Sequence, residues 1–97
     1  MFRVKKNLLY INDNLVFTKE INSFLSKYFK KVYFTTDMPR IEEISSQKDL
    51  KIIVVDTRFV SYELSSLLEK VQMNNEKLML LFQHEKKSLH ELFQFMK

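Results

Sequence analysis

The sequence predicts an α/β domain in which four parallel strands alternate with amphipathic helices. Short runs that are almost wholly apolar predict strands buried on both faces of a sheet, at residues 8–11, 51–55 and 78–82. A further strand is predicted at residues 32–36, which are rich in β-branched and aromatic side chains. Because a helical pattern follows each strand, we expect right-handed crossovers and one parallel sheet.

The first two helices are predicted from apolar spacing and from a capping residue. The first has one apolar stripe, and the lysines near its expected end suit the negative pole of the helix dipole. The stripe consists of Phe17, Ile21, Phe24, Leu25 and Tyr28, and the lysines are Lys27, Lys30 and Lys31. The second helix should begin after Asp37 as N-cap, with Pro39 in its first turn and Ile41 and Ile44 facing inward.

The last two predicted helices flank the fourth strand. Leucines at positions 64, 67 and 68 and a valine at position 71 give the third helix an apolar face. Ser88 and Glu91 form a capping box, so a fourth helix is predicted over residues 88–96. We also expect the hydroxyl of Tyr10, within the first strand, to reach the edge or top of the sheet.

Composition excludes several classes of protein. The chain has 97 residues, which is enough for one domain with a modest core. It has no glycine, which excludes P-loop and dinucleotide-binding loops, and no cysteine, which excludes disulfides and thiolate sites. The net charge of +4 comes partly from lysine clusters without interleaved aromatic residues, so we expect a solvated face and not a nucleic-acid site. No apolar run is long enough to span a membrane, and a cytoplasmic location is expected.

Polar residues follow two of the predicted strands at the points where those strands end. Asn12 and Asp13 come directly after residues 8–11, and Asp56 comes directly after residues 51–55. The carboxyl ends of neighbouring parallel strands open onto one crevice, so the two carboxylates should meet there. Such a pair could hold a divalent cation or accept a phosphoryl group.

This ordered set of strands, helices and acids resembles the receiver domain of bacterial two-component response regulators, over essentially the whole of residues 1–97. In that family an acidic pair follows the first strand and a phospho-accepting aspartate ends the third. Asn12 and Asp13 stand at the acidic pair, and Asp56 stands at the acceptor. The resemblance implies a flavodoxin-like, three-layer α/β/α fold with strand order 2-1-3-4. The fifth strand and helix of the family are missing.

The resemblance also implies roles for these residues. Asp56 would accept a phosphoryl group, and the metal site would consist of Asp13, Asp56, the backbone carbonyl of Arg58 and, weakly, Asn12. Magnesium would neutralise charge on the transferring group.

The departures from the family pattern weaken that chemistry. Asn12 removes one negative charge from the metal site, so Mg²⁺ binding should be weak or absent. Phe82 and Gln83 stand where the family has its switch hydroxyl, and no lysine-bearing fifth strand follows. Arg58 lies two residues after Asp56, so it could pair with that carboxylate, replace the charge of the metal and lower the pKa.

These observations predict a degenerate receiver that acts mainly through protein contact in a two-component phosphorelay. Its partner would be a histidine kinase or another signalling protein, or a second copy of the chain joined through the edge strand 78–82 or the helix 88–96. The alternative is a competent receiver that accepts phosphate on Asp56 with Mg²⁺. An aspartate-based enzyme is disfavoured because Arg58 stands where such enzymes have a second acid. The 97 residues are either a truncated receiver or the N-terminal part of a longer protein.

Overall fold

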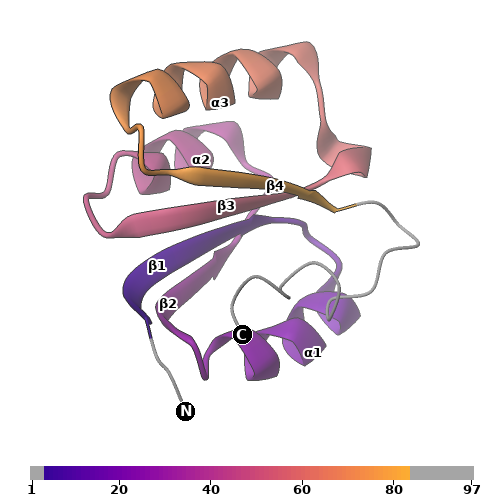
Figure 1. The fold of residues 1–97 in the computed structure, drawn as a ribbon. Coiled ribbons are helices and arrows are strands. Elements are labelled where there is room, and N and C mark those ends of the chain that lie inside the picture. Colours follow the sequence, from indigo (N-terminus) through magenta and orange to yellow (C-terminus); the bar gives the residue numbers. More distant parts are fainter. Residues whose placement is uncertain (1–3, 84–97) are drawn as a thin grey trace.

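The computed structural model describes residues 4–83 and has an α/β architecture, shown in Figure 1. Its elements alternate along the chain as the sequence predicts. In order they are β1 (Val4–Ile11), α1 (Leu15–Leu25), β2 (Phe29–Phe34), α2 (Met38–Ser45), β3 (Leu50–Asp56), the short 3₁₀ turn η1 (Thr57–Phe59), α3 (Tyr62–Asn74) and β4 (Met79–Gln83). The predicted fourth helix, residues 88–96, lies outside the described part of the chain.

The four strands form one sheet in the order β2-β1-β3-β4, and every neighbouring pair is parallel. The predicted strand order is therefore confirmed for the described residues. Strands β1 and β3 lie at the centre of the sheet. Strand β2 is added on the outer side of β1, and β4 is added on the outer side of β3. The order thus reverses between β1 and β3, the two central strands, and it is compatible with a flavodoxin-like fold.

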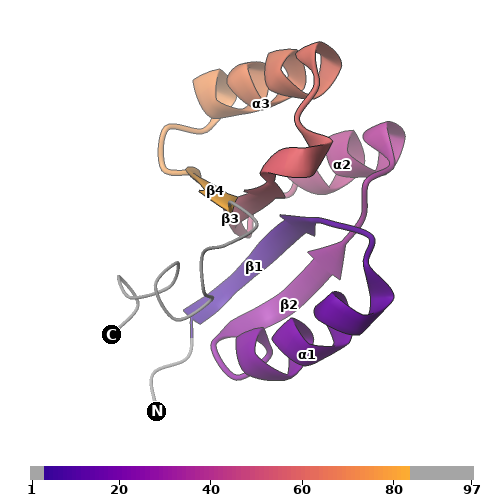
Figure 2. The same cartoon turned by 90° about the vertical axis from the view of Figure 1, so that its right-hand side faces the viewer.

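Helices cover both faces of the sheet and divide the core into two layers. Helix α1 lies on one face, while α2 and α3 lie together on the other (Figures 1 and 2). Side chains of β1 and β3 alternate between the layers: Leu9 and Ile53 pack under α2 and α3, and Leu8 and Ile52 pack on the side of α1. Because both faces are covered, residues 52–55 are all buried, which explains the continuous apolar run in the sequence.

Each helix begins at a polar side chain that accepts a hydrogen bond from the backbone of its first turn. The caps are Asn14 for α1, Asp37 for α2 and Ser61 for α3. The prediction of Asp37 as N-cap is confirmed, because its carboxylate accepts from the N–H of Arg40 at 3.2 Å. No residue between 4 and 83 has a positive φ, so all these turns use the ordinary regions of backbone conformation.

The prediction of the first helix was wrong at its C-terminal end. Helix α1 ends at Leu25, and β2 begins four residues later, at Phe29. Lys30 and Lys31 therefore lie in a strand and do not face a helix terminus. The physical reason is pairing with β1, in which Phe29 lies opposite Val4, so tertiary contacts override the helical spacing of the apolar residues.

Within residues 4–83, the helices are all too short or too polar to cross a membrane.

Candidate functional site at the carboxyl edge of the sheet

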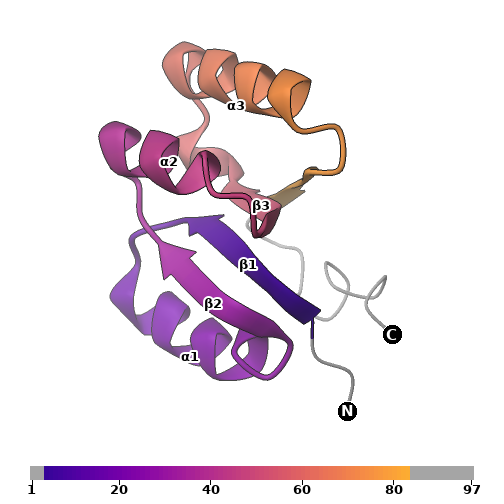
Figure 3. The same cartoon turned by 90° about the vertical axis from the view of Figure 1, so that its left-hand side faces the viewer.

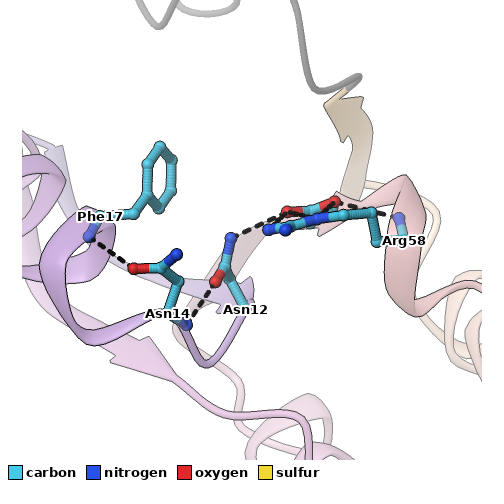
Figure 4. Close-up of polar contacts among 5 residues, drawn as sticks. Asn12, Asn14, Phe17 and Arg58 are labelled. Carbon is cyan, nitrogen blue, oxygen red and sulfur yellow. Dashed lines mark hydrogen bonds and ion pairs between the residues drawn. The ribbon is translucent and has the colours of Figure 1, made fainter.

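The sequence predicts that the carboxylates of Asp13 and Asp56 meet at this edge of the sheet. In the structure, the residue after β1 whose side chain contacts Asp56 is Asn12, at the point where the strand order reverses. Ile11 pairs with Val55, so the next residues, Asn12 and Asp56, leave adjacent strands at the same level. Both are buried: Asp56 is 5% exposed and Asn12 is 1% exposed. Figure 2 views the molecule towards this carboxyl edge. The Nδ2 of Asn12 donates to Oδ2 of Asp56 at 3.0 Å, which joins the two strand ends (Figure 4).

Arg58 binds the carboxylate of Asp56 through both its side chain and its backbone. Its Nη2 donates to Oδ2 at 2.7 Å, and its Nε lies 3.1 Å from Oδ2 and 3.2 Å from Oδ1. Its backbone N–H donates to Oδ1 at 3.0 Å. The turn η1 makes this possible, because it folds the chain back directly after Asp56, the N-cap of η1. The predicted pairing of Arg58 with Asp56 is confirmed (Figure 4).

The hydrogen bonds of Asn12 also fix the loop that follows β1. Its Oδ1 accepts from the backbone N–H of Asn14 at 2.8 Å. Asn14 in turn caps α1, because its Oδ1 accepts from the N–H of Phe17 at 3.1 Å (Figure 4). A continuous chain of hydrogen bonds therefore runs from Arg58 through Asp56 and Asn12 to the start of α1.

The ionisation of Asp56 is set by two opposing effects. Burial of the carboxyl raises its pKa, while the side-chain and backbone hydrogen bonds and the charge of Arg58 lower it. The net result is a pKa below the ordinary value for aspartate, so Asp56 is ionised at neutral pH. The positive charge that a divalent cation would bring is already present as a guanidinium. That guanidinium is accessible, since the Arg58 side chain is 49% exposed.

Tyr10 lies in β1 directly before Ile11, and its hydroxyl, expected at the edge or top of the sheet, is buried. The residue is completely buried, and its hydroxyl has no hydrogen-bond partner in the described structure. The ring packs between Phe17 and Phe34, with centroids at 5.6 and 5.8 Å, which holds it inside the core layer under α1. Burial and the charge of Asp56 both raise the pKa of the phenol, so Tyr10 stays protonated.

The remaining predicted site residues, Asp13, Phe82 and Gln83, differ in how far their side chains are exposed. Asp13 is exposed on the loop after β1. Gln83 pairs in register with Asp56 and is buried, with its Oε1 lacking a partner in the described structure, whereas the neighbouring Phe82 is 45% exposed. Asn12, Asp56 and Gln83 thus form a polar row across the ends of three strands. Within residues 4–83, no group of three or more acidic, histidine or cysteine side chains could hold a metal ion.

A second polar group, at the amino edge of the sheet, was missed by the sequence predictions. Asn7 and Gln47 are linked there by a side-chain hydrogen bond of 3.1 Å, and Gln47 donates to the hydroxyl of Tyr33 at 3.4 Å. The one available signal was a polar asparagine directly before the apolar run of β1.

Comparisons with models of protein families, with curated proteins and with solved structures found no match.

Proposed function

We propose that this chain is a degenerate receiver of the two-component type, a signalling module that acts through protein contact and is not an enzyme. The observation that carries the proposal is the cluster of Asn12, Asp56 and Arg58 at the reversal point of a parallel sheet of order 2-1-3-4. This is the crevice where open α/β sheets place their functional groups. A buried aspartate at the end of β3 matches the position of the phospho-acceptor in the receiver family.

The surroundings of Asp56 favour protein contact over phosphoryl transfer. Both carboxylate oxygens already accept hydrogen bonds from Arg58, and Oδ2 accepts another from Asn12. A nucleophilic attack by Asp56 would require these contacts to break and a cation to replace them. Arg58 instead neutralises the carboxylate of Asp56, so the site supports the surface around it without phosphate.

That surface is rich in exposed apolar side chains. They lie near the carboxyl ends of three strands, at the same edge of the sheet as the cluster: Leu15 and Val16 begin α1, Val60 and Tyr62 lie at the start of α3, and Phe82 lies near the end of β4. Tyr62 is 90% exposed and Leu15 is 77% exposed. A concentration of large apolar side chains around a polar centre is typical of a protein-binding surface.

The test measures the response of the site to magnesium and beryllofluoride, a mimic of the phosphoryl group on aspartate. Backbone amide resonances of Asp13, Asp56 and Arg58 are followed in the wild type and in Asp56→Ala. A degenerate receiver should show no site-specific shifts up to millimolar Mg²⁺ with beryllofluoride. Shifts at all three residues that Asp56→Ala abolishes would support the alternative, a receiver that is phosphorylated on Asp56. In that case the Arg58 side chain must move away from the carboxylate.

One partner for such a surface is a second copy of the chain. Strand β4 is the outer strand of the sheet formed by residues 4–83, and its Met79 and Phe82 are exposed. An apolar outer strand invites pairing with another strand. We expect the wild-type chain to self-associate in sedimentation velocity, and Phe82→Lys to weaken the association. A wild type that remains monomeric at high concentration would exclude the homodimer and leave a different signalling protein as the partner.

A further inference from the structure

The charged side chains of residues 4–83 are divided unevenly between the two edges of the sheet. We call the first residues of each strand, together with the connection before them, the basic edge; it comprises residues 5–7, 26–31, 46–51 and 75–79. Exposed lysines stand at the start of every strand: at positions 5 and 6 in β1, at 27, 30 and 31 around the start of β2, at 48 and 51 around that of β3, and at 77 before β4. Figure 3 faces this edge of the molecule.

Few carboxylates offset these lysines. The acids within the basic edge are Asp49, which pairs with Lys6 at 3.8 Å, and Glu76. At the opposite edge, the connections that follow the strands carry Asp13 and Asp37, and the charge of Arg58 is opposed by Asp56. The positive charge of the described chain is therefore concentrated at one edge, where it raises the local concentration of anions.

The sheet departs from regular pairing at this edge, and lysines occupy the irregular positions. Residues 50 and 52 of β3 pair with consecutive residues of β1, 7 and 8, so Lys51 is an extra residue in its strand. Between the pairs that β1 forms with β2 at residues 4 and 7, β1 has Lys5 and Lys6 where β2 has Lys30. Bulges of this kind re-aim side chains. Lys51 is accordingly exposed although the other residues of β3 are buried.

Protection of an outer strand explains only some of these lysines. Lysine on an outer strand hinders pairing with another sheet, and this accounts for Lys30 and Lys31 in β2. Lys51 lies in β3, and residues 5 and 6 lie in β1; both are central strands. Like charges at the starts of adjacent strands repel one another, and an anionic partner against the edge would relieve that repulsion.

The arrangement of the lysines favours a large anionic surface over one small anion. Lys30 and Lys31 are consecutive in β2, so their side chains leave opposite faces of the sheet and do not converge. A bilayer surface is larger than the whole edge and attracts every exposed lysine near it. Clusters of several lysines are a common feature of proteins that bind anionic lipids.

The residue types favour lipid over nucleic acid. The cations of the basic edge are all lysine, a flexible point charge, whereas arginine is the usual residue for the fixed geometry of nucleic-acid phosphates. Its aromatic residues are Phe29, which is buried, and Tyr28, which is half-buried, so it presents no exposed ring on which a base could stack. It does carry exposed apolar side chains: Met79 is 37% exposed, and Met73, near the end of α3, is 78% exposed. Lysines beside exposed apolar side chains suit the interface of a membrane.

We propose that the basic edge binds the surface of an anionic lipid bilayer. The lysines lie near the charged headgroups, and Met73 and Met79 contact the apolar part of the interface. The opposite edge, with the Asp56 cluster, then faces away from the bilayer and stays accessible to a protein partner. The basic edge lies at the other end of the strands from Asp56 and does not depend on the receiver assignment, so failure of one proposal leaves the other intact.

The first experiment measures co-sedimentation of the chain with vesicles made of equal amounts of phosphatidylserine and phosphatidylcholine, and with vesicles of phosphatidylcholine alone. The variant Lys30→Gln/Lys51→Gln removes two exposed charges from the basic edge, and the matched control Lys19→Gln/Arg40→Gln removes two exposed charges from α1 and α2. A lysine near an anionic bilayer strengthens binding about fivefold, so we expect binding about 25-fold weaker in the variant and close to that of the wild type in the control.

Two outcomes of this experiment overturn the proposal. One is absence of binding to the anionic vesicles, or equal binding to the neutral ones. The other is an equal loss in the two double variants, which would indicate non-specific attraction to a basic protein.

The second experiment locates the surface in contact with the bilayer. The chain has no cysteine, so a single introduced cysteine can carry a fluorophore that is sensitive to its environment. Met73→Cys and Leu15→Cys place it at opposite edges, at side chains that are 78% and 77% exposed. Anionic vesicles should shift the emission to the blue at position 73 and leave it unchanged at position 15. Equal shifts, or a shift at position 15 alone, would contradict the assignment to the basic edge, and no shift at either would exclude the contact of Met73.

A duplex DNA oligonucleotide tests the other polyanion under the same salt conditions. We expect it to bind more weakly than the vesicles when both affinities are expressed per negative charge. Tighter binding of DNA, lost to the same extent in Lys30→Gln/Lys51→Gln, would identify nucleic acid as the partner of the basic edge and overturn the assignment to a bilayer.

Discussion

The two edges of this sheet solve the same problem, the burial of polar side chains, in different ways. At the carboxyl edge, Asp56 accepts hydrogen bonds from Arg58 and Asn12, and Asn12 uses both its donor and its acceptor within the protein. At the amino edge, Asn7 uses only its donor, and its Oδ1 is buried without a partner. The oxygens of Asn12 and Asp56 all accept hydrogen bonds, although the neighbouring Gln83 has an unpaired Oε1, whereas Oδ1 of Asn7 accepts none.

This difference bears on the stability of the folded chain. Hydrogen bonds that satisfy buried polar atoms lower the free energy of the folded chain. A buried oxygen that accepts no hydrogen bond costs stability. The comparison makes quantitative predictions, because removing a satisfied side chain should cost more than removing an unsatisfied one.

The largest effect should follow loss of the guanidinium at the carboxyl edge. Arg58→Ala leaves the buried carboxylate of Asp56 without its cation, and we expect it to lower the free energy of unfolding by about 2 kcal/mol. The control is Arg40→Ala, which breaks an exposed ion pair with Glu43 and should cost less than about 0.5 kcal/mol. Urea unfolding of both variants measures the difference. Equal costs would show that the Asp56 network contributes no more than a surface ion pair.

A smaller effect should distinguish the two buried asparagines. Asn12→Leu removes a donor to Asp56 and the acceptor for the N–H of Asn14, whereas Asn7→Leu removes one side-chain bond and one unpaired oxygen. We expect Asn12→Leu to be more destabilising by about 1 kcal/mol in thermal or urea unfolding. The comparison between the edges is wrong if Asn7→Leu proves the more costly change.

The pH dependence of stability gives a third test, in which the sign matters more than the size. The pKa of Asp56 is lower in the folded state than in the unfolded chain, so its stabilising contribution is present above the ordinary aspartate pKa. That contribution is lost as the pH falls through the lowered folded-state pKa, because the unfolded chain takes up the proton first.

Arg58→Ala removes the side-chain hydrogen bonds and the charge that lower the pKa of Asp56, and leaves the hydrogen bond from the backbone of residue 58. The pKa of Asp56 should therefore be higher in the variant, which should lose less stability than the wild type as the pH falls. Unfolding free energies of the two proteins should therefore converge in acid. If the unfolding free energies of the two proteins changed in parallel with pH, Arg58 would not control the ionisation of Asp56.

The smallest effect concerns the two tyrosine hydroxyls. Tyr10→Phe removes a buried hydroxyl that has no partner, and we expect a change below about 0.5 kcal/mol, towards greater stability. Tyr33→Phe removes an acceptor from Gln47 at the amino edge and should be slightly destabilising. Calorimetric melting temperatures of the two variants decide the order. A clear loss in Tyr10→Phe would reveal a partner for its hydroxyl.

The parts of the structure that could be predicted from sequence depend on short-range patterns. Residues 52–55 form a continuous apolar run because both faces of β3 are covered. The start of the short helix α2 is predicted by Asp37 as N-cap and by Pro39 in the first turn. The contact of Arg58 with Asp56 was also predictable, because a spacing of two residues across a tight turn brings the side chains together.

The parts that could not be predicted depend on partners distant in sequence. The end of α1 is set by pairing of Phe29 with Val4, and helical spacing through Tyr28 gives no sign of it. The complete burial of the Tyr10 side chain depends on its aromatic neighbours, Phe17 on α1 and Phe34 on β2. The contact of Asn7 with Gln47 spans 40 residues, and neither residue belongs to a motif.

The backbone of residues 4–83 contains no left-handed residue, and the chain has no glycine at all. The unfolded chain therefore has fewer accessible conformations than a glycine-containing chain of the same length, and it loses less conformational entropy on folding. Loop positions in this range are also free of the strain that an alanine suffers where a glycine is required. An alanine scan of its turns would thus report the chemistry of each side chain separately from the geometry of the backbone.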